Sequence, residues 1–183
     1  MSNPLETWAV HALREMRHQL EGDRAWGVRG AAGKKLDVEK PGPAVHLAVF
    51  VEPYLSLLLD GTKTIESRFG QRRSIPYERV APGDVMLLKA SSGPVVGISE
   101  IVDAAYFDLR TEPVRAIRRR FGKQIAADAE FWEHCEGASY ATLLDVRNAR
   151  ALPSPIACPK RDRRGWVIFD RATLQNLATT TLE

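Results

Sequence analysis

The feature that most constrains the fold is a series of short apolar runs between residues 46 and 169, separated by turn residues. The runs HLAVFV (46–51), VMLLKA (85–90) and GWVIFD (165–170) are short and rich in apolar and β-branched residues, so they predict strands. Helical patterns interrupt the series at only two places, YLSLLLD (54–60), which Gly61 is placed to end, and the basic segment from Pro113 to about Glu136. The arrangement therefore predicts an α+β fold, a small mixed β-barrel with inserted helices.

An extra N-terminal helix is predicted before the barrel. Asn3 is a suitable N-cap, Pro4 suits the first helical position, and apolar residues then recur at helical spacing until Gly22. The following residues are rich in Gly, Lys and Pro and predict a linker or an extended arm. The chain is thus expected to comprise an N-terminal helix and linker (1–43), a barrel domain (44–171) and a C-terminal tail (172–183).

This division makes the first 40 residues an appendage. Because the barrel pattern begins near His46, a chain that starts at Pro41 is expected to fold cooperatively by itself. The sequence leaves open whether the N-terminal helix folds back on the barrel, recruits a partner or forms a homodimer.

Composition excludes several classes of protein. The 183 residues are 44% hydrophobic and 27% charged, as in globular rather than disordered proteins. No apolar stretch approaches the roughly 20 residues of a membrane span, and the N-terminus lacks the apolar core of a secretory signal, so a cytoplasmic protein without membrane contact is expected. Neither the two cysteines nor the four histidines have the spacing of a metal site, so no metal or other cofactor is predicted.

Basic residues are concentrated in two segments, although the net charge is only +3. Residues 110–123 hold six basic residues against one acid, and residues 160–164 hold four against one. Such clusters indicate an anionic partner, of which nucleic acid is the commonest. The alternative is a solvated helix face and a solvated loop.

Two further features lie near these charges in the sequence. Lys89 ends a predicted strand beside Ser91, where hydroxyls and loop amides can hold a phosphate, although an ordinary hairpin turn has the same composition. Trp166 follows the second basic cluster, which suits base stacking and equally suits a core aromatic residue. The candidate nucleic-acid contacts in these segments are Lys89, Ser91, Lys160, Arg161, Arg163, Arg164 and Trp166.

The segment GTKTIESR (61–68) places a lysine, a glutamate and an arginine within six positions. On a strand, Glu66 and Arg68 share one face, roughly 7 Å apart at their backbones, while Ile65 points to the core. The long side chain of Lys63 reaches the same opening from the preceding turn. Two cations around a carboxylate can hold a phosphate or polarise a carbonyl, with Glu66 as proton acceptor. The alternative is a structural ion pair at a rim.

The order of these segments resembles the ASCH domain family of the PUA-like superfamily. The Gly-x-Lys-x-x-Glu-x-Arg motif of that family falls on Gly61, Lys63, Glu66 and Arg68, and the resemblance spans residues 46–169. It implies a small β-barrel with a cleft, beside the first helix of the barrel, that binds RNA or modified nucleobases. Some ASCH proteins are nucleases.

A branch of acetylcytidine amidohydrolases is also similar, but it uses a threonine three residues after the motif lysine. Glu66 stands at that position here, while Thr64 directly follows Lys63, which disfavours this activity. The leading hypothesis is an RNA- or nucleotide-binding protein in which Lys63 and Arg68 join the contacts named above. The alternatives are a metal-independent ribonuclease with Lys63, Glu66 and Arg68 as catalytic residues, and a hydrolase of a modified nucleoside.

Overall fold

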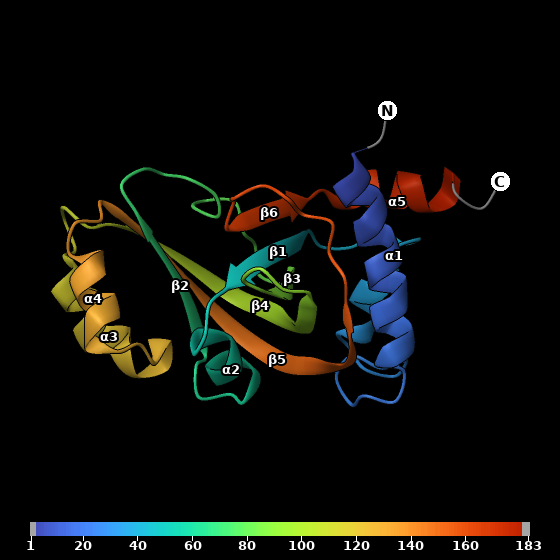
Figure 1. Ribbon diagram of the computed structural model, residues 1–183, viewed down its shortest axis with the longest axis horizontal. Helices are drawn as coiled ribbons and strands as arrows, with labels where there is room; N and C mark the ends of the chain where they lie inside the picture. The colour runs from blue at the N-terminus through green and yellow to red at the C-terminus, as the bar shows by residue number, and fades with distance from the viewer. Residues whose placement is uncertain (1–2, 181–183) are drawn as a thin grey trace.

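The computed structural model describes residues 3–180, within which six strands form one mixed sheet in the order β2-β5-β4-β3-β1-β6 (Figure 1). β1 and β3 are parallel and all other neighbouring strands are antiparallel. The predicted α+β architecture is confirmed. The strands are β1 (Val45–Phe50), β2 (Ile65–Gly70), β3 (Val85–Ala90), β4 (Val95–Asp108), β5 (Tyr140–Ile156) and β6 (Trp166–Phe169).

The two parallel strands are buried on both faces. In β1 and β3, Val45, Leu47 and Leu87 belong to one hydrophobic core, whereas Ala48 and Met86 belong to a second core on the other face. Side chains alternate across a strand, so a strand with two buried faces needs a continuous apolar run. This explains why these two segments carry apolar residues at consecutive positions instead of alternating apolar and polar ones.

Register shifts bend the long strands into a half-barrel. The pairing of β4 with β5 shifts at three places, and such bulges increase strand twist and curvature. At Gly97, a Cβ atom would lie 2.8 Å from both the Arg150 carbonyl oxygen and a Leu59 methyl group, so the curl brings α2 against the sheet backbone. β2 and β6 are the two edge strands and do not pair with each other, so the sheet does not close into a complete barrel.

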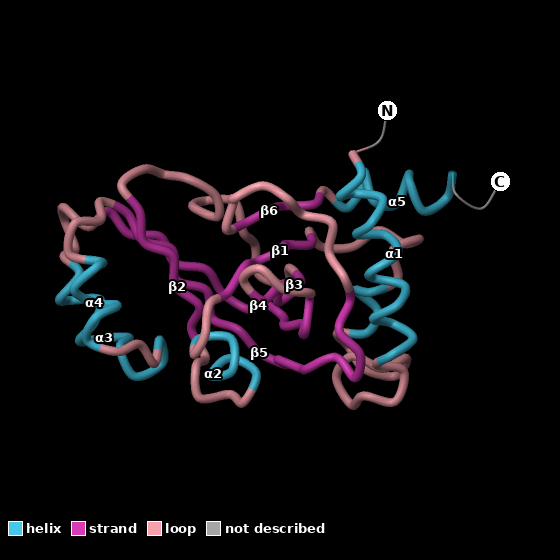
Figure 2. The backbone as a smooth tube through the Cα atoms, viewed as in Figure 1, coloured by secondary structure: helices cyan, strands magenta, loops and turns pink. Residues whose placement is uncertain are grey.

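Except for α2, the labelled helices lie at the two ends of the sheet (Figures 1 and 2). α3 and α4 lie beside β2, α2 lies under the curl, and α1 and α5 lie together at the opposite end. No helix in residues 3–180 combines the length and apolar character that a membrane span requires. The helices are α1 (Pro4–Gln19), α2 (Tyr54–Leu59), α3 (Val114–Ile125), α4 (Ala129–Cys135), α5 (Arg171–Thr180) and the short 3-10 helix η1 (Gly33–Leu36).

Two helical segments differ from the sequence-based expectation. The basic segment was expected to be one helix from Pro113 to Glu136, but it is two, because Ala126 has a positive φ of 52° and ends α3. Asp128 then caps α4 by accepting a hydrogen bond from the Phe131 amide at 2.8 Å. The segment expected to be a tail after residue 171 forms α5, which contributes Leu174 to the core.

The N-terminal helix begins as predicted and folds back on the barrel. Asn3 caps α1 by accepting a hydrogen bond from the Leu5 amide at 3.0 Å. Leu13 and Met16 of α1 are fully buried in the core that also contains β1 and β3 residues. The apolar face of α1 is thus covered by its own chain, so a homodimer formed through this helix would have to use other residues.

The segment between α1 and β1 is also tied to the barrel. Trp26 and Leu36 are buried in the same core, and the Trp26 indole donates a hydrogen bond to the Asn148 carbonyl oxygen at 2.6 Å. The Arg171 guanidinium of α5 donates to the carbonyl oxygens of Lys35 and Lys40 at 3.1 Å. Residues of the expected linker therefore form part of the packed structure. The structure thus indicates that a chain starting at Pro41 would lose part of its core, whereas the sequence predicted that this chain would fold by itself.

We expect deletion of residues 1–40 to abolish cooperative unfolding, because it removes one wall of a shared core. In the full chain, Leu13→Ala is expected to lower the free energy of unfolding by about 2–5 kcal/mol. His11→Ala, on the exposed side of α1, is a control that should stay within about 0.5 kcal/mol of the parent. Urea denaturation, monitored by circular dichroism, measures the unfolding of the truncated chain and of the two variants. Cooperative unfolding of the truncated chain would instead establish the barrel as a separable domain.

Candidate functional site

The motif residues are positioned by the junction between α2 and β2. Gly61 follows α2 with a φ of +83°, a conformation that favours glycine, and the Lys63 amide donates to the Leu57 carbonyl oxygen at 2.8 Å. β2 then pairs with β5, placing Glu66 opposite Leu144. The chain reversal after α2 therefore brings the lysine to the start of the strand that carries the glutamate and the arginine.

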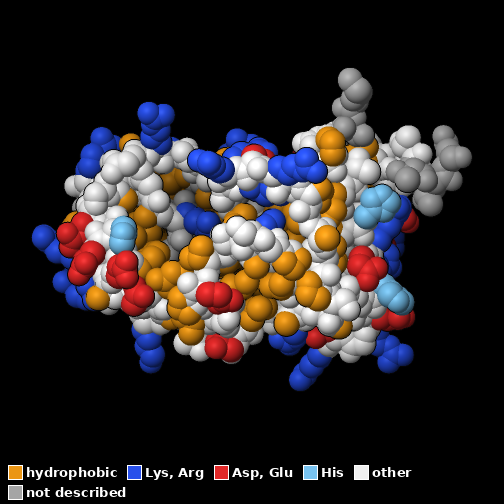
Figure 3. All heavy atoms as spheres, in the orientation of Figure 1, with side chains coloured by type: hydrophobic (Ala, Val, Ile, Leu, Met, Phe, Trp, Pro, Cys, Tyr) orange, Lys and Arg blue, Asp and Glu red, His pale blue; other side chains and the backbone are white. Residues whose placement is uncertain are grey.

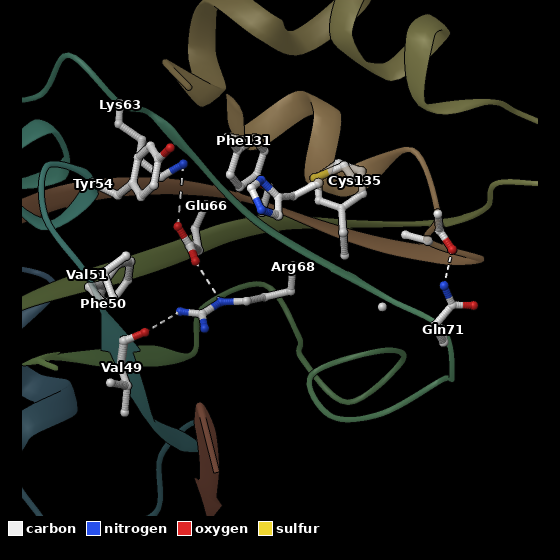
Figure 4. Close-up of a pocket in the computed structure, with 16 residues that line it drawn as sticks. Val49, Phe50, Val51, Tyr54, Lys63, Glu66, Arg68, Gln71, Phe131 and Cys135 are labelled. Atoms are coloured by element: carbon white, nitrogen blue, oxygen red, sulfur yellow. Dashed lines mark hydrogen bonds and ion pairs between the residues drawn. The ribbon is translucent and has the colours of Figure 1, made fainter. Parts of the chain in front are cut away.

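Glu66 lies between the two cations of the motif (Figure 4). Its Oε1 is 2.7 Å from Arg68 Nε in an ion pair whose alignment falls short of a hydrogen bond, and its Oε2 is 3.5 Å from Lys63 Nζ. Only 4% of Glu66 is exposed. A carboxylate buried to this extent requires such partners, because an unpaired buried charge is strongly destabilising.

Lys63 connects the motif to the helical end of the molecule. Its ammonium group donates to the Ile125 carbonyl oxygen at 3.0 Å and lies 5.7 Å from the centre of the Tyr54 ring. Burial lowers the pKa of Lys63, while the Glu66 carboxylate opposes that shift. The lysine thus links β2 to the end of α3 and to α2.

Arg68 is held between two aromatic rings. Its guanidinium carbon lies 5.3 Å from the centre of Phe50 and 5.2 Å from that of Trp166, and Nη2 donates to the Val49 carbonyl oxygen at 2.9 Å. Its side chain is 26% exposed. A cation fixed in this way keeps donors available to a ligand without having to be ordered on binding.

Trp166 supports Arg68 instead of offering a free stacking surface. The ring is only 2% exposed, and its Nε1 donates to His46 Nδ1 at 3.1 Å. Because indole nitrogen can only donate, His46 Nδ1 is the acceptor and His46 Nε2 carries the proton that faces Asp84 at 2.8 Å. Trp166 is therefore a core aromatic residue, which is one of the two roles that the sequence left open for it.

A cavity of about 470 Å³ opens beside these residues, and we call it the motif cavity. Its charged groups include those of Lys63, Glu66 and Arg68, and its walls include the rings of Tyr54 and Phe131 from α2 and α4. Figure 3 shows basic side chains at the floor of a hollow with a largely hydrophobic rim. The volume falls in the range of pockets that bind small organic ligands, of about 300–1,000 Å³.

Several residues of the motif cavity were missed by the sequence analysis. Ser67 is 7% exposed, and among residues 3–180 its hydroxyl has no hydrogen-bond partner. A buried hydroxyl without a partner costs about 1–3 kcal/mol, which a polar ligand group can recover. Strand alternation assigned Ser67 to the core side with Ile65, and no signal in the sequence shows that α4 leaves a cavity there.

His134 of α4 also lines the motif cavity and is exposed to solvent. Its Nδ1 lies 2.7 Å from the Glu130 carbonyl oxygen, which can only accept, so Nδ1 carries a proton and Nε2 is the acceptor of the neutral ring. The sequence analysis considered the four histidines only as metal ligands or members of a triad. Within residues 3–180 no group of three His, Cys, Asp or Glu side chains could hold a metal ion.

The basic cluster and the predicted phosphate loop come together in a second cavity of about 380 Å³, the basic cavity. Lys89 donates to the carbonyl oxygens of Ala90 and Gly93 at 3.0 and 2.7 Å, so it also holds the hairpin turn. Val49 borders both the basic cavity and the motif cavity. The basic cavity is lined by Lys89, Ser91, Ser92, Lys160, Arg161, Arg163 and Arg164, together with Val49, Asp162 and Gly165.

The charges of the basic cavity are only partly neutralised. Asp162 pairs with Lys160 at 2.9 Å and with Arg164 at 2.8 Å. Arg161 and Arg163 have no acidic group within 4 Å in the part of the chain that the structure describes. They are the cations of this cluster that remain available to an anion, whereas the arginines of α3 line neither cavity.

Cys135 offers a chemical probe of the motif cavity. It is a free thiol in the cavity wall, and burial raises its pKa to about 12. We expect iodoacetamide at pH 8 to modify Cys135 more slowly than the half-buried Cys158 in the folded chain, because the thiolate is the reactive form. Peptide mass spectrometry measures both rates, and the two should converge in urea. Equal modification rates for Cys135 and Cys158 in the folded chain would contradict the burial of Cys135 in the cavity wall.

No family model matches the sequence, and no curated protein is significantly similar to it. Solved structures do match. The crystal structure of ASCH from Zymomonas mobilis superposes with a TM-score of 0.56 and 17% sequence identity. The match covers 74% of this chain and 94% of the Zymomonas chain. A single-residue variant of the same protein superposes with a TM-score of 0.57 and 16% sequence identity, and the match covers 77% of this chain and 99% of the variant chain. The resemblance is thereby confirmed for the fold, since this chain has the fold of the ASCH structures from Zymomonas mobilis.

Proposed function

We propose that the protein binds single-stranded RNA, with one nucleotide in the motif cavity and the adjoining backbone phosphates on the basic cavity. The observation that carries the proposal is the contact of the two cavities at Val49, beside the fixed cation Arg68. A groove of positive charge next to aromatic walls is the usual design of single-strand binding sites. ASCH proteins, whose fold the chain shares, generally bind RNA.

Each part of the motif cavity has a role in this proposal. Tyr54 and Phe131 supply aromatic surface for a base, since their rings lie 5.5 Å apart at the cavity wall. The Ser67 hydroxyl is a polar partner for an edge of that base or for the ribose. Arg68 faces the phosphate, because guanidinium groups bind phosphate through several donors at once.

Binding without chemistry is favoured by the state of Glu66. Both carboxylate oxygens are already paired with cations, and the side chain is almost completely buried. A general base has to reach the proton that it removes, whereas both oxygens of this buried carboxylate already face protein cations. Glu66 is therefore better suited to hold Arg68 and Lys63 in place than to accept a proton.

A metal-independent ribonuclease is the second candidate. The observation that favours it is the buried Lys63, whose pKa is lowered by burial, next to the fixed cation Arg68. Such groups can stabilise charge that develops on a phosphate. The nucleoside-hydrolase alternative has less support, because Thr64 is exposed and does not line the motif cavity.

Two variants separate binding from cleavage. Arg68→Ala is expected to weaken binding of labelled single-stranded RNA by about tenfold or more, as for other arginine contacts. Glu66→Gln should weaken binding only a few-fold if Glu66 holds Arg68 in place, with no change in RNA integrity. If Glu66 is a general base, Glu66→Gln should instead bind as the parent does and lose about 100-fold or more in cleavage.

Arg147→Ala is the matched control for these variants, since Arg147 is exposed on β5 and lines none of the cavities. Fluorescence anisotropy gives affinity, gel electrophoresis with and without chelator gives cleavage, and thermal unfolding verifies the fold. Undiminished RNA binding by folded Lys63→Ala and Arg68→Ala variants would remove the motif from the binding site. A matching single-stranded DNA tests the preference for RNA.

Binding should also depend on salt through the basic cavity. Each phosphate contact in single strands contributes about 0.7 to the slope of log affinity against log salt. We expect Arg161→Ala/Arg163→Ala to lower that slope, whereas Arg29→Ala/Lys34→Ala, which removes two exposed charges elsewhere, should not. Titrations at several salt concentrations measure the slopes. An unchanged slope in the first double variant would exclude the basic cavity from the RNA contact.

A further inference from the structure

A third cavity, of about 410 Å³, lies between the loop after β2 and the start of β6. We call it the β2-loop cavity, and Arg68 and Trp166 are the residues of its wall that the sequence analysis had named as candidates. Its walls include Ile75 and Tyr77 from that loop and Tyr140 and Thr142 from β5. Ile75 is 40% exposed, which is unusual for a large apolar side chain in this protein.

The β2-loop cavity shares wall residues with each of the other two cavities. It shares residues 68–71 with the motif cavity and Gly165 with the basic cavity. At this junction Arg68 donates to the Val49 carbonyl oxygen, and the Val49 amide donates to the Gly165 carbonyl oxygen at 3.0 Å. A Cβ atom at Gly165 would lie 3.4 Å from Arg68 Nη1, an ordinary van der Waals contact, so Gly165 packs directly against the guanidinium.

The chemistry of the β2-loop cavity suits a base. The rings of Tyr77 and Tyr140 meet edge to face at 5.4 Å, and the Arg73 guanidinium packs over both, at 5.5 and 5.1 Å. Because Tyr77 is only 8% exposed, the surface that a base can reach is that of Ile75 and the half-buried Tyr140. Arg72 is exposed in the cavity wall and has no acidic group within 4 Å among residues 3–180. Aromatic and aliphatic surface with an unpaired cation nearby is what binds a nucleotide without strong sequence preference.

Arg68 borders the motif cavity and the β2-loop cavity at the same time. Its position is fixed by Phe50, Trp166 and Val49 while about a quarter of its side chain stays exposed. In an RNA strand a phosphate stands between each pair of neighbouring nucleosides. A fixed cation between two base-sized cavities therefore matches the spacing of charge in a dinucleotide.

We infer that the β2-loop cavity holds a second base, so that the ligand is at least a dinucleotide unit of single-stranded RNA whose linking phosphate contacts Arg68. This inference rests on the proposed function and narrows it, because a free nucleoside or mononucleotide fills only part of the site. The basic cavity then receives the next phosphate along the strand, since it meets the β2-loop cavity at Gly165.

The test compares a mononucleotide with a dinucleotide. Isothermal titration of the full chain with uridine 5′-monophosphate and UpU, and with the adenosine pair, should show the dinucleotides binding at least about tenfold tighter, the gain expected from stacking one more base. Ile75→Glu, which places a negative charge in the β2-loop cavity alone, should remove most of that gain and leave the mononucleotide affinity unchanged. Arg72→Ala should reduce the gain by a smaller factor.

Val28→Glu is the matched control, because Val28 is an exposed apolar residue, at 61%, that lines none of the three cavities. Equal affinities for mononucleotide and dinucleotide in the parent would overturn the second base site and leave the proposed function standing. Equal weakening of both ligands by Ile75→Glu would also overturn it. If the folded parent binds neither these ligands nor longer RNA, both the inference and the proposed function are wrong.

Discussion

The ion pairs of the buried Glu66 carboxylate with Lys63 and Arg68 hold together the open side of the half-barrel. β2 and β1 are separated in the sheet by β5, β4 and β3, yet Arg68 of β2 donates a hydrogen bond to the Val49 carbonyl oxygen of β1. Glu66 orients that arginine, and Lys63 ties the same carboxylate to the end of α3. One buried acid thereby connects the edge strand β2 with β1 and with the end of α3, although β2 and β1 share no backbone hydrogen-bond ladder.

The same arrangement explains how a small molecular surface can present three adjoining cavities. Phe50 and Trp166 hold the Arg68 guanidinium from two sides, and His46 holds the Trp166 ring through a hydrogen bond with a defined tautomer. Because these supports are buried, the cation does not lose conformational freedom when a ligand binds. Under the proposed function, this preorganisation serves recognition of a phosphate, and Glu66 is a positioning residue for that cation.

Much of the fold follows from local patterns, and the departures have local causes. Asn3 and Pro4 define the start of α1, Gly61 ends α2, and the doubly buried β1 and β3 appear as continuous apolar runs. The break between α3 and α4 was missed because Ala126 is a good helix former that adopts a positive φ only in the packed structure. The role of residues 20–43 was missed because isolated apolar residues such as Trp26 carry no periodic signal.

The sequence by itself determined the α+β class, the strands and the grouping of Lys63, Glu66 and Arg68, because strand periodicity and a short motif act over a few residues. Only the tertiary structure decided what those residues face. It buries Trp166 as a support, brings Lys89 and residues 160–164 into one cavity, and places Ser67 and His134 in another. These relations join strands and helices distant in the chain, and the curl that creates them arises from bulges and packing that no local pattern encodes.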